Sequence, residues 1–426
     1  MTNTWQLDGL PVDVLLMIFE FCNEFDLLRL SEVCKRFNDI TRKDVLWIKK
    51  SKHFLVTNQT SERFRARCST ILSPRTMLFV SYNWRYGIFN KQTMLTQRAK
   101  LIPWLKMTND MLWWSGNKGL LGFGRGKEAT IDETHGNCYR TEPYIGGDIC
   151  KFVLWKNFII CGYMDGSVNY FLKRFDTREC CIAKILPKNN CSVNAIDATS
   201  TNLVAGLENG TVKILRHPDM DTPEKTIYRD SQVRYICLQD KVRSLSVDPT
   251  EAKCAVGSSG INSIPPLHVI DMERYTMVDT IRHTWRHGAG ILDMVWDDPN
   301  TLLTCGYDTC IRKWDLRSGR CVCSWADPFD ATPYCISSDY RYSMVTGTQY
   351  NCMAVLWDQR KSDFVQLYYV NTRTSTRHSP IYSIQFDSSH LYCATDRLVI
   401  ELSFSAHSCQ KYDYKSLLSS YVEQLR

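Results

Sequence analysis

The regular spacing of short apolar runs constrains this 426-residue chain more than any other feature. The clearest unit begins at His287-Gly288, continues through ILDMVW, DDPN and LLTCG to Tyr307-Asp308, and ends with CIRKW at Trp314-Asp315. Short β-prone runs separated by turn residues predict strand, turn, strand, tight turn and strand. In this unit the tight-turn residue Asp308 lies six residues before Trp314.

The same offset recurs in the chain beyond about residue 75. It joins Asn117 to Phe123, Asp165 to Phe171, Asn209 to Leu215, Asn351 to Trp357 and Asp396 to Leu402. With Ile270 added, the markers of the third strand are residues 123, 171, 215, 270, 314, 357 and 402, which lie 43 to 55 residues apart. Such intervals are typical of propeller blades. The longest one contains GSSGINSIPP, a Gly/Pro-rich insertion that lengthens a loop.

Seven units predict an all-β propeller of seven blades, because a four-stranded blade buries both faces only within a closed ring. The last unit has a weak fourth strand after Leu402, whereas the β-rich segments Met77–Val80 and Tyr86–Asn90 precede the first unit. We therefore expect the N-terminal segment to close the ring against the C-terminal one.

Before residue 75 the apolar residues have helical spacing. Pro11 suits a first helical position, and a stripe follows at Val14, Ile18, Phe21 and Cys22. Asp26 is the expected cap of a second helix with the stripe Leu27, Leu30, Cys34 and Phe37, and Asp44 that of a third with Val45, Leu46 and Trp47. Three short helices cannot bury all this surface among themselves, so part of it should face a partner. We expect a small all-α domain at 5–50, a connector at 51–75 and the propeller at 76–410.

These two parts resemble two known families. The N-terminal segment resembles an F-box at Leu10, Pro11, Ile18, Leu27, Val33, Cys34, Phe37, Leu46 and Trp47. That resemblance implies that these residues bind a Skp-type adaptor and, through it, a cullin ubiquitin ligase. The β-rich part resembles WD repeats through Trp314-Asp315 and Trp357-Asp358. That resemblance implies a hydrogen-bonded network within one blade, made by His287, Thr304, Asp308 and Trp314. Blades with Phe171, Leu215, Ile270 or Leu402 at the aromatic position should have incomplete networks.

Charge is concentrated in residues 35–75, which hold 11 Lys/Arg against 3 acidic residues. Their net +8 exceeds the +7 of the whole chain, so the rest is nearly neutral. Such a run could meet phosphates or an acidic protein, but it lacks the interleaved aromatics of a nucleic-acid platform. We interpret it as a solvated or partner-facing connector.

The other chemistry-bearing patterns favour structure over catalysis. The 19 cysteines include no C-x-x-C pair, and the N-terminus lacks a basic region before its apolar stretch. We expect reduced thiols, no metal, no cofactor, no membrane span and an intracellular location in cytoplasm or nucleus. His287, Thr304 and Asp308 could imitate a hydrolytic triad, but G-x-S-x-G is absent. The glycines at 119, 122, 124 and 126 lack the Lys-Ser/Thr pair of a phosphate loop.

A target-binding surface is expected at one end of the ring, where the loop entering a first strand and the turn between second and third strands meet. The residues placed there are Arg234, Trp285, Arg286, Tyr307, Tyr350 and Arg377, with Met164 and Glu208 in the same register. Trp, Tyr and Arg dominate protein interfaces. The expected function is a non-catalytic substrate receptor of an SCF-type ubiquitin ligase. A propeller scaffold without a role in ubiquitin transfer and an RNA-associated propeller are the alternatives.

Overall fold

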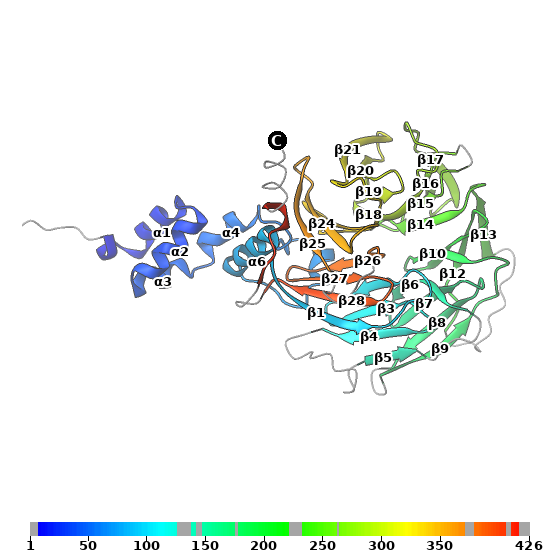
Figure 1. Ribbon diagram of the computed structural model, residues 1–426, viewed down its shortest axis with the longest axis horizontal. Helices are drawn as coiled ribbons and strands as arrows, with labels where there is room; N and C mark the ends of the chain where they lie inside the picture. Colours follow the sequence, from blue (N-terminus) through cyan, green and yellow to red (C-terminus); the bar gives the residue numbers. More distant parts are fainter. Residues whose placement is uncertain are drawn as a thin grey trace, which may run out of the picture.

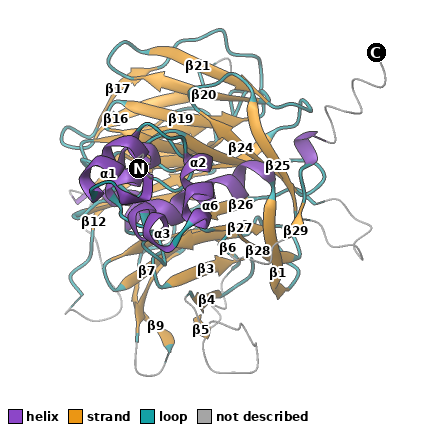
Figure 2. Ribbon diagram, turned by 90° about the vertical axis from the view of Figure 1, so that its left-hand side faces the viewer, coloured by secondary structure: helices purple, strands orange, loops and turns teal. Residues whose placement is uncertain are grey.

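The computed structural model describes residues 7–125, 138–141, 147–174, 178–220, 232–261, 264–370, 379–405 and 410–416. Helices form the N-terminal part, and β-sheets succeed one another around a ring in the rest of the chain (Figure 1). The helices are η1 (Leu7–Gly9), α1 (Val12–Glu20), α2 (Glu24–Val33), α3 (Lys35–Thr41), α4 (Val45–Ser51), α5 (Glu62–Arg65) and α6 (Pro74–Tyr86). Helices α1 to α3 project beyond the ring, and they face the viewer in Figure 2.

The N-terminal helices begin at caps that differ in part from those expected. Asn23 caps α2, because its side-chain oxygen accepts a hydrogen bond from the Asp26 amide at 2.8 Å. The predicted cap Asp26 therefore lies inside the first turn. The Cys34 sulfur accepts from the amide of Phe37 at 3.4 Å and starts a separate helix, α3. Four α-helices thus occupy Val12–Ser51, where the apolar spacing predicts three.

Each blade of the ring is an antiparallel meander. The first six blades are β2 (Trp104–Met107) to β5 (Cys138–Thr141), β6 (Ile149–Trp155) to β9 (Glu179–Ile185), β10 (Val193–Ala198) to β13 (Val233–Cys237), β14 (Val242–Val247) to β17 (Thr276–Thr280), β18 (Ile291–Asp298) to β21 (Arg320–Ala326) and β22 (Pro333–Ser338) to β25 (Phe364–Tyr369). The second and third strands of these six blades are, in chain order, β3 (Met111–Ser115), β4 (Leu120–Gly124), β7 (Phe158–Tyr163), β8 (Val168–Lys173), β11 (Asn202–Leu207), β12 (Thr211–Arg216), β15 (Lys253–Ser258), β16 (Leu267–Asp271), β19 (Thr301–Gly306), β20 (Cys310–Asp315), β23 (Ser343–Thr348) and β24 (Met353–Asp358).

The seventh blade combines the two ends of the chain. It contains β26 (Ser383–Phe386), β27 (His390–Ala394), β28 (Leu398–Ser403) and, as its outer strand, β1 (Ile88–Thr96). Strand β1 pairs antiparallel with β28 over Asn90–Thr96, and Ile88 and Phe89 pair with β29 (Gln410–Lys411). The expected closure is confirmed. Met77–Val80, predicted as β-rich, instead lies within α6, so the helical part extends past residue 76.

All seven sequence markers fall in the third strand of their blades, which confirms the blade register. The turn before the third strand needs a left-handed residue in several blades, and Gly166 and Gly210 have φ of 88° and 86°. Asn351 takes a similar φ of 61° in the sixth blade. Glycine and asparagine tolerate this conformation. The left-handed glycine directly follows the offset residue Asp165 or Asn209, whereas Asn351 is itself the offset residue of its blade.

The meander gives the ring two different ends. The turns between second and third strands and the loops entering first strands lie at one end, which we call the cavity end. The turns between first and second strands lie at the other, which we call the connector end, because residues 54–73 cover it. There the Val56 amide donates to Ser343 Oγ at 2.7 Å, and the Gln59 side-chain amide donates to Ser388 Oγ at 2.8 Å.

Two arginines of the connector contact residues of the propeller. Arg63 lies over the Tyr340 ring at 3.9 Å and donates to the Trp296 carbonyl at 3.0 Å. Arg67 is buried, donates to the Ser338 carbonyl and packs over Phe386 at 4.8 Å. The expectation of a solvated connector is therefore wrong for Arg67, whereas Arg63 remains exposed despite its contacts.

Candidate functional site

The helical domain presents an exposed apolar face on α1. Val14, Met17, Ile18 and Phe21 are exposed, with Phe21 at 92%. Their spacing of i, i+3, i+4 and i+7 places them along one side of the helix. Val33, Val45 and Ile48 add further exposed apolar side chains in the same domain. This area of apolar surface is the feature expected of a protein-binding site.

The opposite side of α1 forms the core of the domain. Leu15 and Phe19 pack with the remaining helices, and the Phe19 and Phe37 rings meet edge to face at 5.2 Å. Trp47 is buried and donates its indole hydrogen to the Thr41 carbonyl at 2.6 Å. Helix α1 is thus apolar on two sides, of which only one is covered by the chain itself.

The nine predicted adaptor-binding residues divide between these two environments. Pro11, Ile18 and Val33 are exposed, and Leu10 and Cys34 are partly buried. Leu27, Phe37, Leu46 and Trp47 are buried in the core of the domain, so direct adaptor contact by these four is wrong for this structure. An apolar pattern marks core and exposed face alike, because both need the same residue types.

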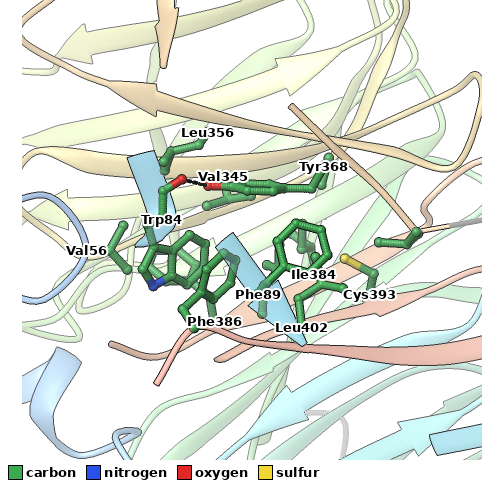
Figure 3. Close-up of a cluster of buried hydrophobic side chains, with 14 of the residues drawn as sticks. Val56, Trp84, Phe89, Val345, Leu356, Tyr368, Ile384, Phe386, Cys393 and Leu402 are labelled. Atoms are coloured by element: carbon green, nitrogen blue, oxygen red, sulfur yellow. Dashed lines mark hydrogen bonds between the residues drawn. The ribbon is translucent and has the colours of Figure 1, made fainter. Parts of the chain in front are cut away.

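Helix α6 joins the helical domain to the ring. Leu78 near its start packs in the core of the helical domain, whereas Trp84 near its end is buried among blades six and seven. Trp84 stacks on Phe404 at 3.7 Å and donates its indole hydrogen to the Ser388 carbonyl at 2.9 Å. The Trp84 carbonyl accepts from the Tyr368 hydroxyl at 2.6 Å (Figure 3). One helix therefore contributes to both cores and fixes one domain on the other.

The predicted blade network is formed in part. Trp314 Nε1 donates to Thr304 Oγ1 at 2.9 Å, and Trp357 repeats this bond to Thr346 at 3.0 Å. Asp308 pairs with Arg312 and accepts from the Cys310 amide. His287 is exposed, so its assignment to the network is wrong. The imidazole beside Trp314 is that of His283, at 5.4 Å and edge to face.

A cavity of about 460 Å³ opens at the cavity end of the ring. Its lining comes from the beginnings of first strands and from turns between second and third strands. The lining residues are Leu101, Ile102, Trp104, Cys150, Lys151, Met164, Ser192, Asn194, Glu208, Arg243, Leu292, Tyr307, Tyr334 and Tyr382. Blades five, six and seven each contribute one of the three tyrosines.

The electrostatics of the cavity arise from a few charged groups. Lys151 lies over the Trp104 ring at 4.0 Å, and burial lowers the pKa of Lys151. Glu208 accepts a hydrogen bond from Lys241 at 2.9 Å, and this bond and the charge of Lys241 lower the pKa of Glu208. Arg243 Nε donates to Ser259 Oγ at 3.0 Å.

The structure places the residues predicted to bind a target in different environments. Tyr307, Met164 and Glu208 line the cavity, as the register predicts. Tyr350 is exposed in the corresponding turn of blade six, outside the cavity lining. Arg286 is exposed in the loop before β18. Arg377 lies outside the described residues.

Two of these predictions need correction. Arg234 was expected to precede a first strand, but it lies within β13, the outer strand of blade three, opposite Ile214. Trp285 is partly buried, packs on Trp314 at 5.3 Å and donates to the Ile281 carbonyl at 3.0 Å. Its ring supports blade five.

The sequence register did not predict Trp104, Lys151, Arg243 and Tyr334 as lining residues. They share a position within the first three residues of a first strand. Tyr382 directly precedes β26. The signal was present in the blade register, because the start of every first strand points to the same end of the ring.

Metal-binding groups, disulfides and membrane-spanning helices were also considered among the described residues. Among those residues there is no group of three or more His, Cys, Asp and Glu side chains able to hold a metal ion. Every cysteine described is a free thiol. No described helix has the length and apolar character needed to cross a membrane.

The helical part and the ring together define a small F-box-like domain fixed on a β-propeller. Residues 7–53 match the F-box-like family. The chain is 27% identical to F-box/WD repeat-containing protein 4 of Mus musculus over 93% of this chain and 92% of that protein. The Homo sapiens protein of the same name is 26% identical over 93% and 91%. The designed Ika8 protein shares the fold alone, with a TM-score of 0.50 and 13% identity over 70% of this chain and 82% of Ika8.

Proposed function

We propose that this protein is a substrate-recognition subunit of an SCF-type ubiquitin ligase. In this role the F-box-like domain binds a Skp-type adaptor and through it a cullin, and the propeller binds a target protein for ubiquitination and degradation. The observation that carries the proposal is the exposed stripe Val14, Met17, Ile18 and Phe21 in a domain that matches the F-box-like family. We also propose that dactylin is the family member that the segments CGYMDGSV and LYCATDRL resemble most.

The chain contributes proximity to the transfer reaction and no catalytic group. Holding a target lysine beside a charged conjugating enzyme makes a bimolecular encounter effectively unimolecular. This requires a fixed distance between the adaptor surface and the target surface. The contribution of α6 to both cores supports such a fixed geometry, because Leu78 and Trp84 are separated by less than two helical turns. We place this activity in the cytoplasm or nucleus.

The proposal is tested by co-purification of adaptor and cullin with the full chain from cells. Replacing Ile18 and Phe21 together by Asp should abolish adaptor binding, because charged groups cannot be buried in an apolar interface without a large cost. The control is Tyr350→Ala, which changes an exposed aromatic residue on the propeller, away from the helical domain. If the Asp variant still bound the adaptor, the alternative function would be favoured, namely that of a propeller scaffold with no role in ubiquitin transfer.

A further inference from the structure

Four hydroxyl residues of the chain are followed directly by proline, namely Ser73, Thr222, Thr332 and Ser379. A Ser-Pro or Thr-Pro pair is the minimal sequence that proline-directed protein kinases phosphorylate. Thr332 and Ser379 are only 7% and 8% exposed, and Thr222 lies outside the described residues. Ser73 is exposed. Among the described residues, the structure therefore leaves Ser73 as the accessible one of these sites.

The local conformation of Ser73 suits an enzyme that modifies its hydroxyl. The residue has an extended backbone, with φ of −67° and ψ of 154°, and Pro74 is the first residue of α6. The Ser73 Oγ accepts from the Thr76 amide at 3.3 Å and lies 2.8 Å from the Thr76 hydroxyl. Thr76 is exposed as well, so the hydroxyl can leave these contacts without opening the core.

The surroundings of Ser73 include two arginines. Arg75 lies two residues further on, and burial and then the charge of Arg42 at the end of α3 lower the pKa of Arg75. No carboxylate of the described residues contributes to that shift. Glu32 and Asp39 share a groove with Arg42, so Arg75 is the more available cation for an anion attached to Ser73.

We propose that Ser73 is a phosphorylation site of a proline-directed protein kinase and that its phosphate stabilises the start of α6. In this reaction Ser73 Oγ bonds to the γ-phosphorus of ATP, and the bond from that phosphorus to the β–γ bridging oxygen breaks. ADP leaves, and the catalytic base of the kinase accepts the hydroxyl proton. The exposure of the Ser-Pro pair carries this inference, which does not depend on the proposed function.

The stabilising effect follows from where the phosphate is attached. It adds about −1.5 to −2 charges at the start of a helix, next to the Thr76 amide and near Arg75. Negative charge is favourable at this end of a helix. Helix α6 contributes Leu78 to the core of the helical domain and Trp84 to a core of the ring. The modification therefore acts on the element that fixes one domain on the other.

The first test is phosphorylation of the folded full chain by a purified mitogen-activated protein kinase with ATP. A Thr222→Val background removes the site outside the described residues, so that phosphate reports on the other three. Peptide mapping should find phosphate at Ser73 and none at Thr332 or Ser379. The positive control is a synthetic peptide of residues 67–79. An unmodified Ser73 under conditions that phosphorylate this peptide, or equal modification of Thr332 or Ser379, would overturn the proposal.

The second test measures the effect of the phosphate by hydrogen exchange of the first turn of α6. The parent with and without phosphate is compared, because Ser73→Ala would also remove the helix cap. We expect exchange about two- to fivefold slower in the phosphorylated chain. Arg75→Met should reduce this slowing, whereas the matched control Arg85→Met, at the exposed far end of the same helix, should retain it. Unchanged or faster exchange after phosphorylation would overturn the stabilising role.

Discussion

Arg125 and Asp387 form an ion pair in which each side chain is only 1% exposed. Arg125 follows the third strand of blade one, and Asp387 lies in the first turn of blade seven. Arg125 also donates to the Arg67 carbonyl at 2.8 Å, and Asp387 accepts from the Ser69 hydroxyl at 3.2 Å. One buried pair therefore joins the first blade, the last blade and the connector at the place where the ring closes.

Removing one member of this pair should destabilise the ring strongly. Arg125→Met leaves the buried carboxylate without its cation, and breaking such pairs costs about 3–5 kcal/mol. We expect a correspondingly lower urea midpoint, measured by tryptophan fluorescence. The control Arg397→Met removes a half-exposed partner of Asp396 and should cost less than about 1 kcal/mol. Equal midpoints for the two variants would contradict the assigned role of the Arg125–Asp387 pair.

The stability of this region should depend on pH through His390. Burial alone would lower the pKa of His390, but its hydrogen bond and charge interaction with Asp387 outweigh burial and raise the pKa above the ordinary 6.5. The protonated form therefore stabilises the fold fully below pH 6.5, and this contribution is lost as the pH rises through the higher folded value. The melting temperature of the parent minus that of His390→Gln should accordingly fall with rising pH. A difference that is independent of pH would contradict this.

Asp387 should affect the stability of the fold at acidic pH. Burial would raise the pKa of Asp387, but His390, Arg125 and the Ser389 amide outweigh it and lower the pKa below the ordinary 3.8. Its contribution is present above pH 3.8 and is lost as the pH falls toward the lower folded value. An Asp387→Asn variant should therefore lose less stability than the parent on acidification below pH 4. The comparison is made by thermal unfolding in the same buffers.

Asp308→Ala and His287→Ala should separate the formed part of the blade network from the unformed part. Asp308→Ala leaves Arg312, whose side chain is largely buried, without its partner, at a cost of about 1–3 kcal/mol. His287 is exposed, so His287→Ala should change the free energy of unfolding by less than about 0.5 kcal/mol. Chemical denaturation of both variants checks this contrast. A larger effect at His287 would restore it to the network.

Phe21→Ala and Leu27→Ala should distinguish the adaptor surface from the core beneath it. Phe21 is exposed, so its loss should weaken adaptor binding at least tenfold while unfolding changes by less than about 0.5 kcal/mol. Leu27 is buried, and its truncation should cost about 2–5 kcal/mol of stability. Isothermal titration with the adaptor, alongside thermal unfolding, measures both quantities. Unchanged affinity of Phe21→Ala would remove Phe21 from the interface.

Local sequence patterns were enough to predict the blade register and a helical N-terminal domain. Asp308 and Trp314 mark one blade because a turn and the strand after it are built from neighbouring residues. The same local chemistry repeats in every blade, so markers from residue 123 to residue 402 fall in third strands. Periodicity also identified α1, although it did not separate its buried side from its exposed one.

Contacts between residues far apart in the chain could be found only in the folded structure. Arg67 contacts Ser338 and Arg125 contacts Asp387 across more than 250 residues of sequence, and neither pairing leaves a local pattern. The cavity likewise exists only once the ring is closed, because its lining extends from Trp104 in blade one to Tyr382 in blade seven. Ring closure brings these residues together, because their separation in space depends on the number and twist of all the blades between them.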